Sequence, residues 1–258
     1  MRSAADVAVE RSPAPYDGCT GDQLARTLGL PRVVAFAEVG STLDIAHALA
    51  ADGAPAGTLI LADAQTSGRG RMGRSWRSEA GAGIWMTLIE RPRDVVALEV
   101  LSLRIGLSLA PVLDAFTASA VQLKWPNDLY VGARKLGGIL VEARWRDSAP
   151  EWVAVGVGIN VRAPENEPLA VGLQTTASRV EVLSRLVPAM RDAATRTGSL
   201  DRDELDAFAA RDAVVGRRCR EPIAGSIRGI DASGALLIDV GSEIVAIRAG
   251  SLVLEEEL

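Results

Sequence analysis

Residues 68–76 alternate three glycines with three arginines and end in a tryptophan, within a chain whose net charge is −5. Guanidinium groups fit phosphate and carboxylate and stay charged at physiological pH. Glycines let the backbone reach positive φ and approach a ligand closely. Apolar runs at 57–63 and 84–89 predict strands on both sides. The segment is therefore predicted to be an anion-binding loop on a rigid scaffold; the alternative is a solvated basic turn.

A second stretch, residues 124–130, places a polar pair directly after a proline. Pro126 has no backbone N–H to donate to a sheet ladder, so a strand that begins at Val121 must end before it. Asn127 and Asp128 are then held at a strand end, where they could contact a ligand. The alternative is an ordinary β-turn, which a Pro-Asn-Asp sequence favours.

Glycines interrupt two further apolar segments. Gly137 and Gly138 follow Lys135 at the start of a strongly apolar run. Gly158 precedes Asn160 at the end of the next one. Glycine inside a strand commonly marks close approach of a ligand or of another backbone. These positions are therefore candidate site positions, and an exposed lysine on a strand edge is the alternative for Lys135.

The composition excludes several kinds of site. His47 is the single histidine and is predicted to lie on a helix surface, so His-rich zinc sites lack ligands. A Ser-His-Asp triad would need His47, yet no nucleophile-elbow pattern accompanies it. Cys19 and Cys219 match no metal or redox spacing, which favours a reduced, cytoplasmic protein. With no phosphate-loop or dinucleotide motif either, an enzyme with this sequence must work without a tightly bound cofactor.

Length and hydropathy limit the architecture. A chain of 258 residues can form one large domain, or one with a small appendage. Residues 1–15 are predicted to be disordered and lack the apolar stretch of a signal peptide. No segment is expected to reach the apolar length of a membrane span. A main unit is predicted at 16–212, and the short apolar runs between Gly and Asp turns at 213–258 predict a small SH3-like barrel.

The main unit is predicted to be α+β, with a mixed, largely antiparallel sheet packed by helices on one face. A capping box at 20–23 predicts a first short helix, and Ser41 or Thr42 is expected to cap a second. A long apolar helix is predicted at 95–116, with a kink or an end at Pro111. The other predicted elements are strands at 33–37, 57–63, 84–89, 121–124, 136–145 and 152–161, and helices at 178–195 and 201–210.

Taken together, these stretches resemble the biotin protein ligase family. The resemblance lies in four motifs in register: Gly-Arg-Gly-Arg-x-Gly-Arg-x-Trp at 68–76, Lys-Trp-Pro-Asn-Asp at 124–128, Lys-Leu-Gly-Gly-Ile-Leu at 135–140 and Gly-Ile-Asn at 158–160. It implies a catalytic domain like that of class II aminoacyl-tRNA synthetases, followed by the SH3-like barrel. It also implies an activity, in which biotin and ATP form biotinyl-5′-adenylate and the biotinyl group then passes to one lysine of a carrier domain.

The resemblance further implies roles by position. The implied catalytic residues are Lys135, Arg69 and Arg71. The implied biotin contacts are Ser41, Thr42, Gln65, Arg69, Gly70, Arg71 and Lys135. The implied ATP contacts are Arg71, Arg74, Trp76, Lys124, Asn127, Asp128 and Asn160. No metal site built from protein ligands alone is implied, and Mg²⁺ is expected to be carried with ATP.

One position departs from the family pattern. Many members have asparagine after the Ser-Thr pair, where this chain has Leu43, so one polar contact to biotin would be missing. The implied partners are biotin, ATP and the biotin carboxyl carrier domain of a carboxylase. A cytoplasmic monomer or weak homodimer is expected, with no membrane partner. Larger members carry a helix-turn-helix, for which too few residues precede Val33, so DNA binding is not expected.

Three alternatives remain open at the level of sequence. Lipoate ligases share the fold, although the continuous Arg/Gly loop favours biotin. A nucleic-acid-binding module could use the same loop, but the acidic net charge and the 4% aromatic content oppose it. A non-catalytic vitamin sensor is the third, against which Lys135 and the loop arginines argue. Because every chemical motif precedes Val161, the barrel is expected to assist the site, and loop 68–74 is expected to be mobile until a ligand orders it.

Overall fold

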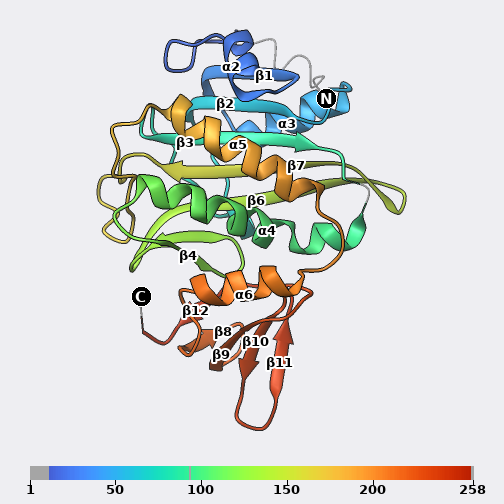
Figure 1. Ribbon diagram of the computed structural model, residues 1–258, viewed down its shortest axis with the longest axis vertical. Helices are drawn as coiled ribbons and strands as arrows, with labels where there is room; N and C mark the ends of the chain where they lie inside the picture. Colours follow the sequence, from blue (N-terminus) through green and yellow to red (C-terminus); the bar gives the residue numbers. More distant parts are fainter. Residues whose placement is uncertain (1–11, 93, 257–258) are drawn as a thin grey trace.

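A seven-stranded sheet forms the centre of the protein, in the strand order β1-β2-β3-β7-β6-β5-β4 (Figure 1). Only β1 and β2 pair in parallel, and the other neighbours are antiparallel. The structure is a computed structural model that describes residues 12–92 and 94–256. The predicted α+β class with a mixed, largely antiparallel sheet is confirmed. The strands are β1 (Arg32–Val39), β2 (Thr58–Gln65), β3 (Gly83–Glu90), β4 (Val121–Lys124), β5 (Asp128–Val131), β6 (Arg134–Arg146) and β7 (Ala149–Asn160).

Helices lie on both faces of this sheet. The helices are α2 (Gly21–Leu28), α3 (Thr42–Ala51), α4 (Val95–Leu113), α5 (Arg179–Thr195) and α6 (Arg202–Arg211), with 3₁₀ turns η1 (Arg71–Gly73) and η2 (Asp114–Phe116). Figure 1 shows α4 and α5 side by side across one face. Side chains alternate between faces along a strand, and Val153 and Val155 join the main core beneath those two helices. Trp152 and Ala154 join a smaller core on the opposite face, beneath α3.

Glycines leave part of the α3 face open. Gly156 and Gly158 of β7 fall on the same side as Ala154, because the side-chain period of a strand is two. A Cβ atom on Gly158 would lie 2.7 Å from Nε1 of Trp76. A Cβ atom on Gly156 would lie 3.3 Å from both Cδ atoms of Leu43. The two glycines therefore let other side chains reach the sheet surface directly.

The local signals for helix ends act as the sequence predicts. Thr20 closes a capping box with Gln23 at the start of α2, and Oγ of Ser41 accepts a hydrogen bond from the N–H of Leu43 at the start of α3. Pro111 lies inside α4, which continues to Leu113 before η2 completes the predicted range. The expected end at Pro111 is therefore displaced by two residues, since a single lost N–H near a helix terminus is tolerated.

Helix α4 corrects one expectation. Residues Val95–Phe116 form a 22-residue segment whose most apolar 18-residue window has a mean hydropathy of 1.8, so it is long and apolar enough to cross a membrane by length and composition. Half of its most apolar window is buried inside this fold. Its apolar side chains face the sheet and α5, so the hydropathy is explained by the core that the helix fills.

A buried ion pair lies on the inner side of the same helix. Arg104 of α4 donates from Nε to Oε1 of Glu204 at 2.7 Å and from Nη2 to Oε2 at 3.0 Å. Both side chains are almost fully buried. Burial by itself raises the pKa of the Glu204 carboxyl, but hydrogen bonds from Arg104 and from the N–H of Asp201 outweigh it. The pKa of Glu204 is thus held below its ordinary value.

The C-terminal residues form a second, five-stranded antiparallel sheet in the order β11-β10-β9-β8-β12. Its strands are β8 (Arg218–Glu221), β9 (Gly225–Ile230), β10 (Leu236–Asp239), β11 (Ile244–Ile247) and β12 (Val253–Leu254). Ile227 and Leu236 belong to the same core cluster as α4. Nε1 of Trp125 donates to the carbonyl of Gly234 at 2.9 Å, and this bond is buried. The small sheet therefore shares its core with the larger one.

Two parts of the chain differ from what the sequence suggested. Strand β5 begins at Asp128, where a polar pair at a strand end or a turn was predicted, and continues to Val131, for which no strand was predicted. At the N-terminus, residues 1–11 of the segment expected to be disordered lie outside the described residues. Within the rest of that segment, the N–H of Ala14 donates to the carbonyl of Ala35 at 2.8 Å. The buried Tyr16 then begins the packed part of the chain.

Candidate active site

A cavity of about 510 Å³ opens on the α3 face of the sheet. Its volume is in the range usual for small-molecule sites. Every residue to which the family resemblance gave a role lines it, although these positions span residues 41–160. These residues are Ser41, Thr42, Gln65, Arg69, Gly70, Arg71, Arg74, Trp76, Lys124, Asn127, Asp128, Lys135 and Asn160. Of the candidate glycines, Gly138 and Gly158 line it and Gly137 does not.

One end of the cavity is polar and held in place by side-chain hydrogen bonds. Oε1 of Gln65 accepts from the N–H of Thr42 at 2.9 Å and from its hydroxyl at 3.2 Å. Nε2 of Gln65 donates to Oγ of Ser78 at 2.8 Å. The hydroxyl of the fully buried Thr87 donates to that of Thr42 at 2.8 Å. These contacts fix the orientation of the Gln65 amide, so this recess presents donors and acceptors without first having to rearrange.

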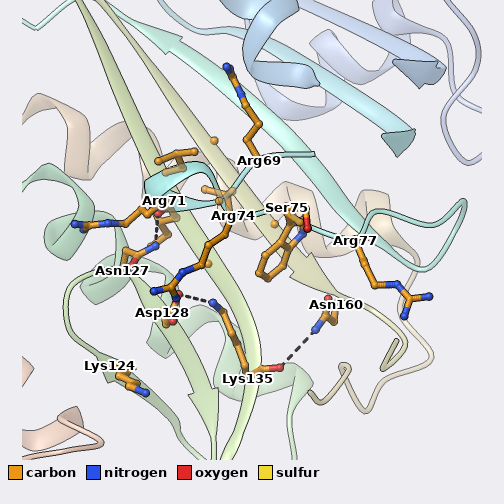
Figure 2. Close-up of a pocket in the computed structure, with 18 of the residues that line it drawn as sticks. Arg69, Arg71, Arg74, Ser75, Arg77, Lys124, Asn127, Asp128, Lys135 and Asn160 are labelled. Carbon is orange, nitrogen blue, oxygen red and sulfur yellow. Dashed lines mark hydrogen bonds and ion pairs between the residues drawn. The ribbon is translucent and has the colours of Figure 1, made fainter. Parts of the chain in front are cut away.

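The other end is cationic. Nζ of Lys135 lies 2.7 Å from Oδ1 of Asp128 and 5.1 Å from the centre of the Trp76 ring. Figure 2 shows Arg74 and Lys135 both pointing toward Asp128. The side chain of Lys135 is 31% exposed, which contradicts the alternative of a freely exposed lysine on a strand edge. Its ammonium lies where it can meet an anion inside the cavity.

Two more cations at this end are partly buried. Burial lowers the pKa of Lys124, and the nearby charges of Lys135, Arg217 and Arg74 lower it further, while Asp128 opposes them. Burial likewise lowers the pKa of the Arg71 guanidinium, with Asp128 opposing and Arg74 adding to the effect. Clustered positive charge of this kind is relieved when an anion binds. The electrostatics thus favour a polyanionic ligand here.

Trp76 separates the two ends of the cavity. Its indole packs against Gly158 on one side and meets Trp85 edge-on, with the ring centres 6.4 Å apart. Nε1 of Trp76 is buried and has no hydrogen-bond partner. A buried N–H without a partner is costly. The N–H is covered at Gly158, so what the residue offers a bound ligand is its ring.

The two asparagines are tied to the backbone by their side chains. Nδ2 of Asn127 donates to the carbonyl of Ile139 at 2.8 Å. Nδ2 of the buried Asn160 donates to the carbonyls of Lys135 and Val171, at 3.4 and 3.3 Å. The bond from Asn160 supports the backbone that carries Lys135. Both amide oxygens and the second N–H of Asn127 remain for a ligand, and the role of the two residues as ATP contacts stays a prediction.

Arg69 lines the cavity, but its guanidinium points away from Lys135 (Figure 2). Nη2 of Arg69 lies 2.9 Å from Oδ1 of Asp44 and 3.3 Å from Oε2 of Glu142. The structure does not bring this guanidinium together with the other proposed catalytic groups. Among the described residues, no group of three or more His, Cys, Asp or Glu side chains could hold a metal ion.

Known proteins match both the sequence and this geometry. The profile of the Biotin/lipoate A/B protein ligase family matches residues 39–160. The biotin–[acetyl-CoA-carboxylase] ligase of Mycobacterium tuberculosis is 35% identical over 236 residues, which cover 84% of this chain and 86% of that protein. The chain belongs to the biotin protein ligase family.

Other relatives agree with this membership. The biotin protein ligase of Aquifex aeolicus in complex with biotin and ATP superposes with a TM-score of 0.71 at 26% identity, covering 87% of this chain and 99% of that one. The bifunctional ligase/repressor BirA of Bacillus subtilis is 41% identical over 131 residues, half of this chain. The match spans 40% of the length of that protein.

Leu43 lies beside the polar recess at the position where many biotin protein ligases have asparagine. It is 4% exposed and packs against the sheet at Gly156. A larger residue at position 156 would collide with it, so the pair forms an apolar wall next to Ser41 and Thr42. Leucine has no polar side-chain group, so it offers the recess no hydrogen bond, and the missing polar contact to biotin stays a prediction.

The C-terminal sheet contributes more to the cavity than the sequence suggested. Gly250, Ser251 and Leu252 line it. Nη2 of Arg74 donates to Oγ of Ser251 at 2.5 Å. The loop before β12 therefore forms part of the cavity wall, and the assisting role expected for this unit stays a prediction. No local sequence signal identifies these three residues, since they bear no catalytic side chain.

Loop 68–76 is folded onto itself as a closed hairpin. The N–H of Trp76 donates to the carbonyl of Gly68 at 2.8 Å, and the N–H of Gly70 donates to that of Arg74 at 2.7 Å. Met72 at its tip has a φ of 56°, a left-handed conformation that is strained for a side chain other than glycine. The tip therefore stores strain, and the expected mobility of the loop without ligand stays a prediction.

Proposed function

We propose that this protein is an ATP-dependent biotin protein ligase, which forms biotinyl-5′-adenylate and transfers the biotinyl group to a lysine of a biotin carboxyl carrier domain. The observation that carries the proposal is the single cavity that joins a preformed polar recess to a cluster of four cations. The recess contains Thr42 and Gln65. The cations are Arg71, Arg74, Lys124 and Lys135.

Biotin fits the recess by its chemistry. A ureido ring needs both hydrogen-bond donors and acceptors, which Ser41, Thr42 and Gln65 supply. The apolar wall of Leu43 and Gly156 suits the neighbouring thiophane ring. With the ring system in the recess, the valerate chain would lead its carboxylate toward Lys135. ATP would then occupy the cationic end, with Trp76 against the base and Mg²⁺ bound to the phosphates as part of the substrate.

The first step joins two anions. A carboxylate oxygen of biotin attacks the α-phosphorus of ATP, the bond from that phosphorus to the bridging oxygen breaks, and pyrophosphate leaves. At about 4 Å and an effective dielectric constant near 20, two unit charges repel by roughly 4 kcal/mol. Lys135 and Arg71 offset repulsion of this size and stabilise the charge that develops in the transition state. No nucleophile from the protein is needed.

The second step completes the transfer. The amine of an acceptor lysine attacks the carbonyl carbon of the adenylate, the bond from that carbon to the phosphate oxygen breaks, and AMP leaves. The acceptor we propose is the biotin carboxyl carrier domain of a carboxylase. We further propose a cytoplasmic monomer or weak homodimer that does not use DNA as a partner, which sedimentation with and without duplex DNA tests.

An exchange assay tests the activity. Purified protein with Mg²⁺, ATP and labelled pyrophosphate is expected to form labelled ATP when biotin is present. Biotin should then appear on a carrier domain but not on the same domain with its acceptor lysine changed to arginine. Equal exchange with lipoate would contradict the biotin assignment and favour a lipoate ligase. Absence of exchange with either acid, together with saturable biotin binding, would indicate a sensor and refute the catalytic proposal.

A further inference from the structure

Arg69 is held on the α3 side of the loop by two carboxylates from different elements. Asp44 lies in the first turn of α3 and Glu142 lies in β6. Nη2 of Arg69 reaches both, at 2.9 and 3.3 Å, and the three side chains are 33–56% exposed. Glu142 falls on the same face of β6 as Gly138 and Leu140, since strand side chains alternate. The pairing therefore connects the start of the loop to α3 and to β6 of the central sheet.

Glu142 is itself held by the only histidine of the chain. Oε2 of Glu142 lies 2.9 Å from Nε2 of His47. Nε1 of Trp152 lies 3.0 Å from Nδ1 of the same ring. An indole N–H can only donate, so Nδ1 accepts and the ring proton lies on Nε2, where it is donated to Glu142. His47 was expected to be an ordinary surface residue, but it orients the carboxylate that receives Arg69.

This fastening determines how the loop faces the cavity. Arg69 pairs with Ser75 across the hairpin in an isolated β-bridge, and the N–H of Gly70 bonds to the carbonyl of Arg74. These bonds join the two sides of the hairpin, so a displacement of Arg69 would also displace Arg74. On the far side, Arg74 reaches Ser251. Two attachments on opposite sides leave Arg71 and Arg74 directed into the cavity.

We propose that Glu142, oriented by His47, is a positioning residue that anchors the loop through Arg69. In this role the guanidinium of Arg69 is a fixed attachment point for the loop and does not touch the reacting atoms. The kinetic part of the proposal rests on the proposed biotin ligase function, whereas the conformational part does not. The anchor raises the fraction of ligand-free molecules whose loop is already in the binding arrangement, and apparent affinity is proportional to that fraction.

The size of the effect follows from the exposure of the pair. Half-exposed ion pairs have modest strength, and losing the contact to Glu142 would change the loop population by about two- to fivefold. Once biotin and ATP are bound, they hold the loop themselves. The anchor is therefore expected to act on the KM for biotin and to leave kcat within about twofold of the normal value.

Glu142→Gln tests this, since an amide keeps the shape and an acceptor for His47 but removes the charge. In the ligand-free full chain, trypsin is expected to cut after Arg71 and Arg74 about two to five times faster than in the wild type. The KM for biotin should rise by a similar factor. Asp206→Asn is the matched control, because Asp206 is an exposed carboxylate on α6 whose partner is Arg202; it should change neither readout.

A double-mutant cycle distinguishes an anchor from two independent contributions. Glu142→Gln added to Arg69→Gln should increase cleavage no further, because Glu142 acts on the loop only through Arg69. Arg69→Gln alone should exceed Glu142→Gln, since it also gives up the contact to Asp44. His47→Gln, which retains a donor, should resemble the wild type, whereas His47→Ala should show part of the effect, with thermal melts confirming that each variant is folded. Three results would overturn the proposal. The cleavage rates of the two single variants could multiply in the double variant, Glu142→Gln could be cut at the wild-type rate, or Glu142→Gln could lower kcat while KM stays unchanged. Absence of biotin-dependent exchange in the wild type would instead count against the ligase function alone, since the cleavage measurement needs no ligand.

Discussion

Replacing Gly158 by alanine would place a methyl group where the indole of Trp76 now lies. The new Cβ would be 2.7 Å from Nε1, 2.9 Å from Cε2 and 3.2 Å from Cζ2 of that ring. Normal contacts between such atoms lie near 3.5–4.0 Å, so the ring has to move by about 1 Å. Trp85 lies edge-on to the indole, which limits how far the ring can tilt out of the way.

The cost of this change can be estimated from the packing. Forcing extra volume into a well-packed contact typically costs about 1–3 kcal/mol. If Trp76 supports the nucleotide as proposed, most of that cost appears when ATP binds. The KM for ATP should then rise by between about fivefold and a hundredfold, because about 1.4 kcal/mol corresponds to a factor of ten. The KM for biotin should change much less, since the polar recess is not displaced.

Pyrophosphate exchange measured over a range of ATP and biotin concentrations separates the two effects. Gly40→Ala is the matched control, because a Cβ there has no neighbour within 4 Å. Gly156→Ala would meet the flexible ends of Leu43 at 3.3 Å, so it should act mainly on biotin. A folded Gly158→Ala protein with a normal KM for ATP would refute the placement of the nucleotide against Trp76.

Three further changes test other parts of the structure. Lys135→Ala should reduce exchange at least about a hundredfold, the loss expected for one preorganised donor, while the melting temperature stays near that of the wild type; near-normal turnover would remove Lys135 from the chemistry. Glu204→Gln strands the buried Arg104 and should cost about 3–5 kcal/mol at pH 7 in urea unfolding; because the folded pKa of Glu204 is lowered, the wild type should lose this advantage as pH falls below the ordinary value of 4.5, and a gap that is constant with pH would contradict the assignment. Trp125→Phe leaves the carbonyl of Gly234 without its donor and should cost about 1–3 kcal/mol of unfolding free energy; an unchanged urea midpoint would show that water replaces the bond.

The residues of the site were predictable where short-range chemistry fixes them. Arginines next to glycines, a proline that ends a strand and a glycine pair inside an apolar run are each constrained by the backbone itself. Helix starts at Thr20 and Ser41 follow from hydrogen bonds within three residues. Such signals need no knowledge of distant partners. The resemblance to the biotin protein ligase family supplied the roles of the other positions, among them Ser41, Thr42 and Gln65.

Other features depend on contacts between distant residues. Arg69 was assigned to chemistry from its neighbours in sequence, whereas its guanidinium is held by Glu142, 73 positions away. Ser251 reaches Arg74 across 177 positions, and its own neighbourhood carries no motif. Strand β5 was missed because it is only four residues long and directly follows a Pro-Asn-Asp turn signal, and its pairing with β4 and β6 involves residues that a local pattern does not show.

The buried bond from Trp125 to Gly234 has a consequence for protein engineering. The residues that carry Asn127 and Asp128 are supported from below by a turn of the C-terminal sheet, and the two sheets share apolar side chains. Exchanging that sheet for one from a relative would therefore alter the active-site turn, even though no catalytic side chain is exchanged. A productive chimaera would need its crossover chosen so that the Gly234 turn and the Ser251 loop stay with the Trp125 segment from the same parent.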